Sequence, residues 1–215
     1  MKTLKYILIG IISITLFLHS NSVSAQNQNN SRFGIKGGFN VSNMLAENAE
    51  SSTIKIGING GIFLRVAVTE LFSFQPELIY TMKGGKLEYN NFVNGTAKIS
   101  LNYMEVPLLA ILNITKNINI QGGIYLASLS NVRIKNKGDT GSYNFEEELN
   151  KNDFKSFDYG LACGIGGDFD KLSVGIRYDY GIRSIGDKKT FGGQTYLFPD
   201  ARNSAFQIYV GLSIL

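Results

Sequence analysis

The sequence contains few reactive and few charged side chains. It has one cysteine, one histidine, three prolines and no tryptophan among 215 residues, and charged residues make up only 18%. A single cysteine excludes a framework of intrachain disulfides, and one histidine cannot supply the imidazoles of most zinc sites. The formal net charge of +4 is too small and too scattered for a nucleic-acid-binding protein. We therefore expect no cofactor, no metal, no nucleic-acid partner and no enzymatic activity.

The N-terminus has the pattern of a secretory signal peptide. Two lysines precede an apolar run over residues 6–18, and small residues stand at the third and first positions before Gln26. A membrane-spanning helix needs about 20 apolar residues, so the run is too short for one. The sequence therefore predicts that residues 1–25 are removed by cleavage near Ala25, which also removes the histidine. A polar leader follows at 26–31.

Apolar residues recur at every second position along the rest of the chain. Segment 54–66 is the clearest case, with isoleucine, leucine or valine on one face and mostly polar residues or glycine on the other. This period of two is typical of β-strands that expose two different faces. It predicts eight strands, at about 32–41, 54–66, 72–83, 98–112, 118–134, 155–167, 172–183 and 203–215.

Short and long connections alternate strictly between these strands. The short ones are 67–71, 113–117 and 168–171, and the long ones are 42–53, 84–97, 135–154 and 184–202. All four long loops then leave from the same end of the sheet. An even number of strands of about ten residues with one-sided long loops indicates a transmembrane β-barrel. We expect residues 32–215 to form an eight-stranded antiparallel up-and-down barrel in the outer membrane of a Gram-negative bacterium, with short periplasmic turns and long extracellular loops.

The fourth strand does not keep a single apolar face. Leu101 and Tyr103 are out of phase with Val106 and Leu108. A β-bulge near residues 104–107 would bring both pairs onto the same face. We expect such a bulge.

The composition of the polar face decides between a soluble and a membrane barrel. A soluble barrel has its apolar face inside and a surface rich in lysine and glutamate. Here the polar face has few charges and many glycines, which suits a crowded polar lumen. The apolar face should then contact lipid, flanked by aromatic girdles. The expected girdle residues are Phe33, Phe72, Phe74 and Phe169 near the periplasmic rim, and Tyr80, Tyr103, Tyr159, Tyr178 and Tyr180 near the outer rim.

Charged residues on the polar face are expected to meet in the lumen. Counting along the strands places Glu77 and Arg177 at similar depth, with Lys36, Glu105 and Asp179 nearby. One interpretation is a path for ions or protons, and the other is a plug of salt bridges. The interior of an eight-stranded barrel is just wide enough for side chains to fill, and buried charges must be paired. These two facts favour the plug.

Four stretches resemble the PorT family of outer-membrane β-barrel proteins of Bacteroidetes-type bacteria. They are Phe33-Gly34-Ile35-Lys36-Gly37-Gly38-Phe39-Asn40, the block 72–80 with Lys83-Gly84, the block 101–108, and Gly175-Ile176-Arg177-Tyr178-Asp179-Tyr180-Gly181. The resemblance spans about residues 32–215 and implies an eight-stranded outer-membrane barrel. Some members of that family assist protein secretion across the outer membrane. One departure is the C-terminus Ser213-Ile214-Leu215, where such barrels usually end in an aromatic residue.

These observations predict a structural or partner-binding protein of the outer membrane. Its long loops contain aromatic residues among polar ones, which suits contacts with a protein or a glycan. The resemblance adds an accessory role in secretion as an expectation. The alternative is a narrow channel for ions or small solutes, and conductance distinguishes the two.

Overall fold

The computed structural model describes residues 31–46, 52–90, 94–138, 145–149, 155–185, 188–191, 194–197 and 201–214. The expected signal peptide at 1–25, and the leader at 26–31 apart from Ser31, lie outside these ranges. Within them, no helix has the length and apolar character needed to span a membrane.

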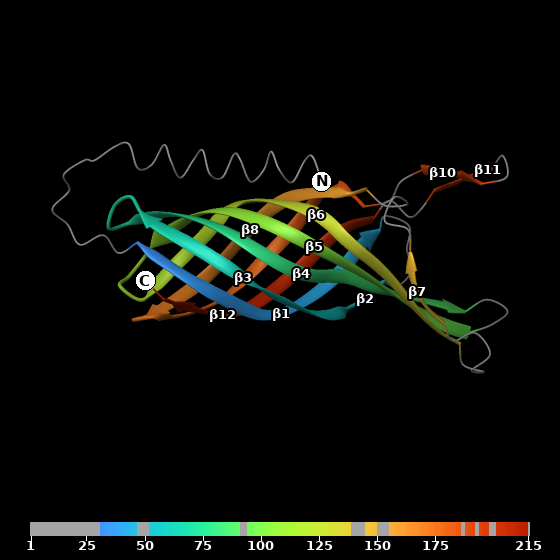
Figure 1. Cartoon of the computed structure of the whole chain (residues 1–215), viewed down its shortest axis with the longest axis horizontal. Helices are drawn as coiled ribbons and strands as arrows, with labels where there is room; N and C mark the ends of the chain where they lie inside the picture. The colour runs from blue at the N-terminus through green and yellow to red at the C-terminus, as the bar shows by residue number, and fades with distance from the viewer. Residues whose placement is uncertain are drawn as a thin grey trace.

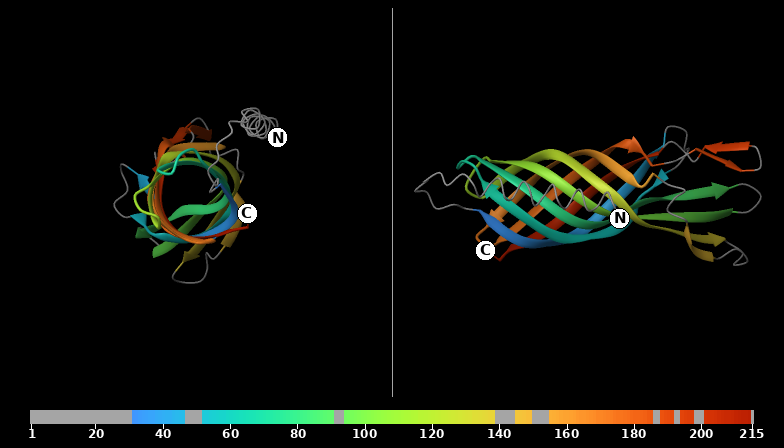
Figure 2. Two further views of the ribbon diagram at one scale, coloured as in Figure 1. Left: turned by 90° about the vertical axis from the view of Figure 1, so that its left-hand side faces the viewer. Right: turned by 45° about the horizontal axis from the view of Figure 1, so that its top comes forward.

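Eight long antiparallel strands form a closed barrel (Figure 1). Each of them pairs with the next along the chain, and the last pairs with the first, so that the ring has no free edge (Figure 2, left). This confirms the fold class expected from the period of two. Closure also satisfies the backbone groups that a strand edge would leave unpaired in hydrocarbon. The strands are β1 (Arg32–Ala46), β3 (Lys55–Ala67), β4 (Phe72–Asn90), β5 (Asn94–Asn113), β6 (Ile118–Gly138), β8 (Phe157–Phe169), β9 (Leu172–Ser184) and β12 (Ala201–Ser213).

Four short strands lie towards the end with the long connections. Strand β2 (Ser52–Thr53) pairs with β4, and β7 (Phe145–Leu149) pairs with β6. A separate hairpin is formed by β10 (Lys188–Phe191) and β11 (Gln194–Leu197). We call the end of the barrel with the long connections the long-loop end. The opposite end, which has the tight connections, is the short-turn end.

Three neighbouring strands extend further than the sequence pattern predicts. Strands β4, β5 and β6 have 19, 20 and 21 residues, whereas β8, β9 and β12 have 13 each. Pairing between β4 and β5 continues up to Asn90 and Asn94. Because about 9–11 tilted residues cross a bilayer, the extra length projects from the long-loop end (Figure 2, right). Parts of the expected loops 84–97 and 135–154 are therefore a β-ribbon.

The two faces of the barrel are inverted relative to a soluble protein. Ile56, Ile58 and Ile176 point outward and are 73%, 52% and 50% exposed. Polar and charged side chains such as Asn40, Gln207 and Glu105 are buried inside. Soluble proteins bury the first kind and expose the second. The apolar face is therefore the outer surface, as expected for a barrel in lipid.

The prediction of a β-bulge near residues 104–107 is wrong. Strand β5 keeps its phase, and Leu101 and Tyr103 point into the lumen, each 1% exposed. The irregularity lies in the neighbouring β6, where Asn102 of β5 pairs with Asn131 but Tyr103 pairs with Leu129. One residue of β6 is therefore unpaired at this point, as in a β-bulge.

The prediction of this bulge was wrong because the lumen is not polar along its whole length. Towards the long-loop end, apolar and aromatic side chains from β5, β6 and the end of β9 pack together inside the barrel. This luminal apolar cluster consists of Ile99, Leu101, Tyr103, Tyr125, Ala127, Leu129, Val132 and Ile185. An apolar residue on an inward position therefore does not signal a change of phase.

Candidate functional site

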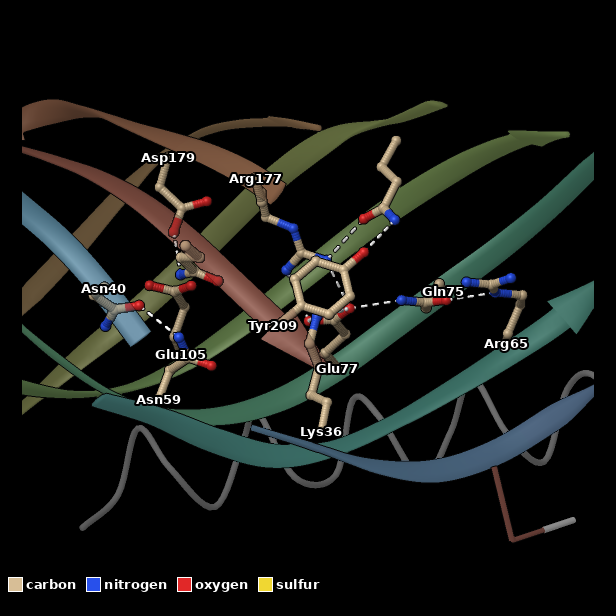
Figure 3. Close-up of polar contacts among 12 residues, drawn as sticks. Lys36, Asn40, Asn59, Arg65, Gln75, Glu77, Glu105, Arg177, Asp179 and Tyr209 are labelled. Carbon is tan, nitrogen blue, oxygen red and sulfur yellow. Dashed lines mark hydrogen bonds and ion pairs between the residues drawn. The ribbon is translucent and has the colours of Figure 1, made fainter. Parts of the chain in front are cut away.

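A network of ion pairs fills the middle of the lumen, with Glu77 of β4 at its centre. Its carboxylate accepts hydrogen bonds from Lys36 Nζ at 3.0 and 3.1 Å and from Arg177 Nη1 and Nη2 at 2.8 Å each (Figure 3). Gln75 Nε2 donates a further bond of 2.6 Å to Oε1. The bidentate pairing with Arg177 is the strongest geometry available to a carboxylate. Strands β1, β4 and β9 are thereby joined across the lumen.

Tyr209 of β12 lies on the strand between those that carry the two cations of this network. Its ring lies beneath Lys36, with 3.7 Å between Nζ and the ring centroid, and within 5.4 Å of the Arg177 guanidinium. Gln121 of β6 accepts a hydrogen bond from Arg177 Nη2 at 3.1 Å and donates one to the Tyr209 hydroxyl. A cation over an aromatic face is stabilised by the ring quadrupole. Together with Glu77, these side chains therefore connect five strands around the lumen: β1, β4, β6, β9 and β12.

A second network lies next to the first, towards the long-loop end. Lys83 Nζ is 2.5 Å from Glu105 Oε2 and 3.3 Å from Asp179 Oδ2. Gln207 Nε2 also donates to Asp179 Oδ2, at 2.6 Å. Both carboxylates were expected in the lumen from the sequence pattern, but Lys83 was not. Its even spacing from Glu77 along β4 is the signal that could have found it, because residues an even number apart share a face.

The two networks are electrically balanced. Lys36, Lys83 and Arg177 face Glu77, Glu105 and Asp179, and each of the six is at most 6% exposed. All five residues expected in the lumen are therefore present there, together with the missing cation. Removing a charge from water costs several kcal/mol, and only close pairing with further hydrogen bonds offsets that cost.

A third network closes the lumen at the short-turn end. Arg65 Nη1 lies 2.6 Å from Asp168 Oδ2, and Arg65 Nε donates to Gln75 at 2.6 Å. Ser173 and Asn119 donate to the same aspartate at 2.8 and 2.6 Å. Asp168 was not expected in the lumen because the sequence pattern predicts a turn at 168–171. It is instead the penultimate residue of β8 and points inward.

The prediction of an aromatic girdle is wrong for one residue. Tyr103 is buried in the lumen, and its hydroxyl accepts a hydrogen bond of 3.1 Å from Asn203 Nδ2. Asn203 Nδ2 also donates to Asp158 at 2.8 Å. Tyrosine has an apolar ring and a polar tip, so it suits both a lipid interface and this mixed interior. Its residue type therefore could not tell the two environments apart.

The other expected aromatic residues lie on the outer face. Tyr178 packs against Phe206, with 4.6 Å between ring centroids, and its hydroxyl is 2.9 Å from Ser204 Oγ. Tyr80 and Tyr159 are 38% and 41% exposed, and Phe169, beside the third short turn, is 54% exposed. The remaining members of the expected set are partly exposed on the same surface: Phe33, Phe72, Phe74 and Tyr180.

Little space remains among the side chains of the lumen. A cavity between Lys36, Arg65 and Tyr209 has a volume of about 10 Å³, which is close to the minimum for one water molecule. Among the residues that the structure describes, no group of three or more His, Cys, Asp or Glu side chains is placed to hold a metal ion. Cys163 lies on the exposed outer face. The geometry therefore suits side chains that bind one another.

Comparison with solved structures finds matches of low sequence identity. The Ail protein of Yersinia pestis, solved with the heparin analogue sucrose octasulfate, is 11% identical over 86% of this chain and 99% of its own, with a TM-score of 0.46. Neisserial surface protein A is 12% identical over 85% and 97%, with a TM-score of 0.46. OprG from Pseudomonas aeruginosa is 15% identical over 88% and 96%, with a TM-score of 0.39. No curated protein sequence matches significantly.

The comparison with protein families gives a direct assignment. The model described as "Outer membrane protein beta-barrel domain" matches residues 24–187. This match covers more than half of the chain and agrees with the closed antiparallel barrel and its apolar outer face. The chain therefore belongs to the outer membrane protein β-barrel domain family.

Proposed function

We propose that the protein is a non-enzymatic outer-membrane barrel with a sealed lumen, which binds its partners at the long-loop end. The observation that carries this proposal is the balanced set of buried ion pairs across the lumen. Towards the long-loop end the luminal apolar cluster fills the same bore. The side chains hold the wall strands together and occupy the space that a solute would need.

The orientation follows from the targeting pattern. In the proposal, residues 1–25 direct secretion and are cleaved near Ala25, and the start of β1 at Arg32 then lies on the periplasmic side. The short turns then face the periplasm, and the ribbons of β4, β5 and β6 reach outside the cell. Paired strands that extend beyond the membrane form a firmer recognition platform than irregular loops, because their backbone is already ordered. They suit a protein or glycan partner.

An accessory role in protein secretion is the finer form of this proposal. Its support is the resemblance of residues 72–84 and 101–108 to the PorT family. The first block forms the start of β4 and carries Glu77, and the second lies in β5 and carries Glu105. These two segments therefore contribute two of the three carboxylates of the central networks.

The channel hypothesis is tested by conductance in planar bilayers. A polar lumen is the feature in its favour, but the ion pairs and the cavity of about 10 Å³ oppose it. We expect the wild-type barrel to pass no steady ion current, while a sixteen-stranded porin in the same bilayer conducts. Insertion is verified by protease resistance of the reconstituted barrel. A steady current from the wild type would support the narrow channel and overturn the sealed-lumen proposal.

Partner binding is tested by photo-crosslinking in intact cells. A photoreactive amino acid replaces Ile54, which is 59% exposed beside the first residue of β3 at the long-loop end. The matched control replaces Ile120, which is 48% exposed on the lipid-facing side of β6. We expect discrete protein or glycan adducts from position 54 and none from 120. Adducts that include secretion components would support the accessory role, and equal adduct patterns at the two positions would contradict specific binding.

A further inference from the structure

A cavity lies at the end of the barrel opposite the long loops. It has a volume of about 730 Å³, within the usual range of ligand sites. We call it the short-turn pocket. Its walls are the β3–β4 connection and the β5–β6 connection, and its base is formed by Arg32, Arg65 and Asp168. The long-loop platform is on the other side of the sealed lumen, so this pocket is a separate feature.

The walls of the short-turn pocket are held in place by hydrogen bonds between the connections. The backbone N–H of Asn113 donates to Leu71 O at 2.8 Å, and its Nδ2 donates to Glu70 O at 2.9 Å. Asn117 and Asp168 bond reciprocally: Asn117 Nδ2 donates to Asp168 O at 2.8 Å, and Asp168 N donates to Asn117 O at 2.8 Å. These contacts fix the pocket before a ligand arrives, which reduces the entropy lost on binding.

The base of the pocket has a cation with unused hydrogen-bonding capacity. Arg65 uses Nη1 on Asp168 and Nε on Gln75. Arg32 is different, because its Nη1 forms an ion pair of 3.8 Å with Asp168 Oδ1 but makes no hydrogen bond. The lining contains three cationic and two acidic side chains in total. A buried N–H of a guanidinium without an acceptor favours an incoming carboxylate.

Two exposed aliphatic side chains lie on the rim of the pocket, among polar residues of the same turns. Leu71 and Ile114 line it and are 64% and 58% exposed, although they lie in turns rather than on the lipid-facing strands. A ligand that fits both features has a carboxylate beside an aliphatic side chain. A peptide C-terminus that ends in an aliphatic residue has these two groups. Capture of a terminal carboxylate is a recurrent mode of peptide recognition.

We propose that the short-turn pocket binds the C-terminal carboxylate of a peptide chain that ends in an aliphatic residue. Arg32 donates to the carboxylate, and Leu71 and Ile114 contact the last side chain. With the orientation proposed above, the ligand comes from the periplasm, but the site itself does not depend on the sealed lumen or on the long-loop partners.

The test is calorimetric titration of the full barrel reconstituted in nanodiscs. The probes are N-acetyl-alanyl-alanyl-leucine, its C-terminal amide, and sodium acetate. We expect the free acid to bind with a Kd below about 1 mM, and the amide and acetate at least tenfold more weakly. Arg32→Gln should weaken binding of the acid about tenfold or more, because it removes a charge-assisted hydrogen bond. Leu71→Ser should weaken binding of the peptide but leave the affinity for acetate unchanged.

The matched control is Lys171→Gln, an exposed cation in the neighbouring short turn that does not line the pocket. It should leave the affinity for the peptide unchanged. Folding of each variant is checked by circular dichroism, and all three positions are at least partly exposed, which favours normal folding. Equal affinity for acid and amide, equal affinity for peptide and acetate, or an unchanged affinity in Arg32→Gln would each overturn the proposal. Conductance is measured independently, so failure here leaves the sealed-lumen proposal standing.

Discussion

Replacement of Glu77 by alanine is expected to lower the unfolding free energy of the barrel by about 3–5 kcal/mol. Its carboxylate accepts five hydrogen bonds, four of them from Lys36 and Arg177. Without it, two buried cations lack a counter-charge and sit close to each other. The loss is measured by urea unfolding in detergent micelles, followed by far-UV circular dichroism. We expect no steady ion current from this variant, since both long cationic side chains remain in the bore.

Two further variants show whether the loss comes from charge or from packing. Glu70→Ala removes an exposed carboxylate from the β3–β4 connection and should change stability by less than about 0.5 kcal/mol. The triple variant Lys36→Met, Glu77→Leu, Arg177→Leu replaces the whole charge group by apolar residues and should recover much of the stability lost in Glu77→Ala. A triple variant that is less stable than the single one would show that the side-chain packing, not the charge balance, dominates.

Alanine at Gly123 is expected to destabilise the barrel by about 3 kcal/mol or more, whereas alanine at Gly122 should be tolerated. A Cβ at Gly123 would lie 2.0 Å from the carbonyl oxygen of Leu108 and 3.0 Å from Leu109 Cα. These are backbone atoms of the paired strand β5, so they cannot move without breaking the pairing. A Cβ at Gly122 meets nothing within 4 Å, and replacing a strand glycine there should stabilise by up to about 1 kcal/mol.

The pair Gly122→Ala and Gly123→Ala is a matched experiment because the positions are adjacent and the added atoms are identical. The measurement is the yield of folded barrel after refolding and the urea midpoint of each product. The expected difference arises from the tight coiling of a narrow barrel, which brings a neighbouring backbone against the inward face. Equal effects of the two substitutions would contradict this explanation.

The polar interior gives this barrel a different source of stability from that of a soluble domain. Its apolar side chains face outward, so the lumen is held together by hydrogen bonds and ion pairs such as those of Glu77 and Lys83. Well-packed apolar replacements of buried ion pairs are often as stable. The loss of one partner is severe, however, and this asymmetry makes single charge removals the most informative substitutions.

The sequence pattern predicted some features of the lumen and missed others. It placed Glu77 and Arg177 inside at similar depth, and the structure joins them by a bidentate ion pair. It missed the role of Lys83 and placed Tyr103 on the wrong face. Alternation reports which face a residue is on only while the inside is polar and the outside apolar. Where the lumen becomes apolar, as around Tyr103, an apolar side chain can face inward, and alternation no longer identifies the outer face.

By itself, the sequence determined the strand count, the antiparallel barrel and the one-sided long connections, because a period of two and the spacing of turns are local properties. It also determined which charges share a face. Only the tertiary structure decided which charges pair across the bore, how far β4, β5 and β6 extend, and that two turns enclose a pocket above Arg32. These features depend on the stagger between strands and on contacts between distant turns, which no local pattern encodes.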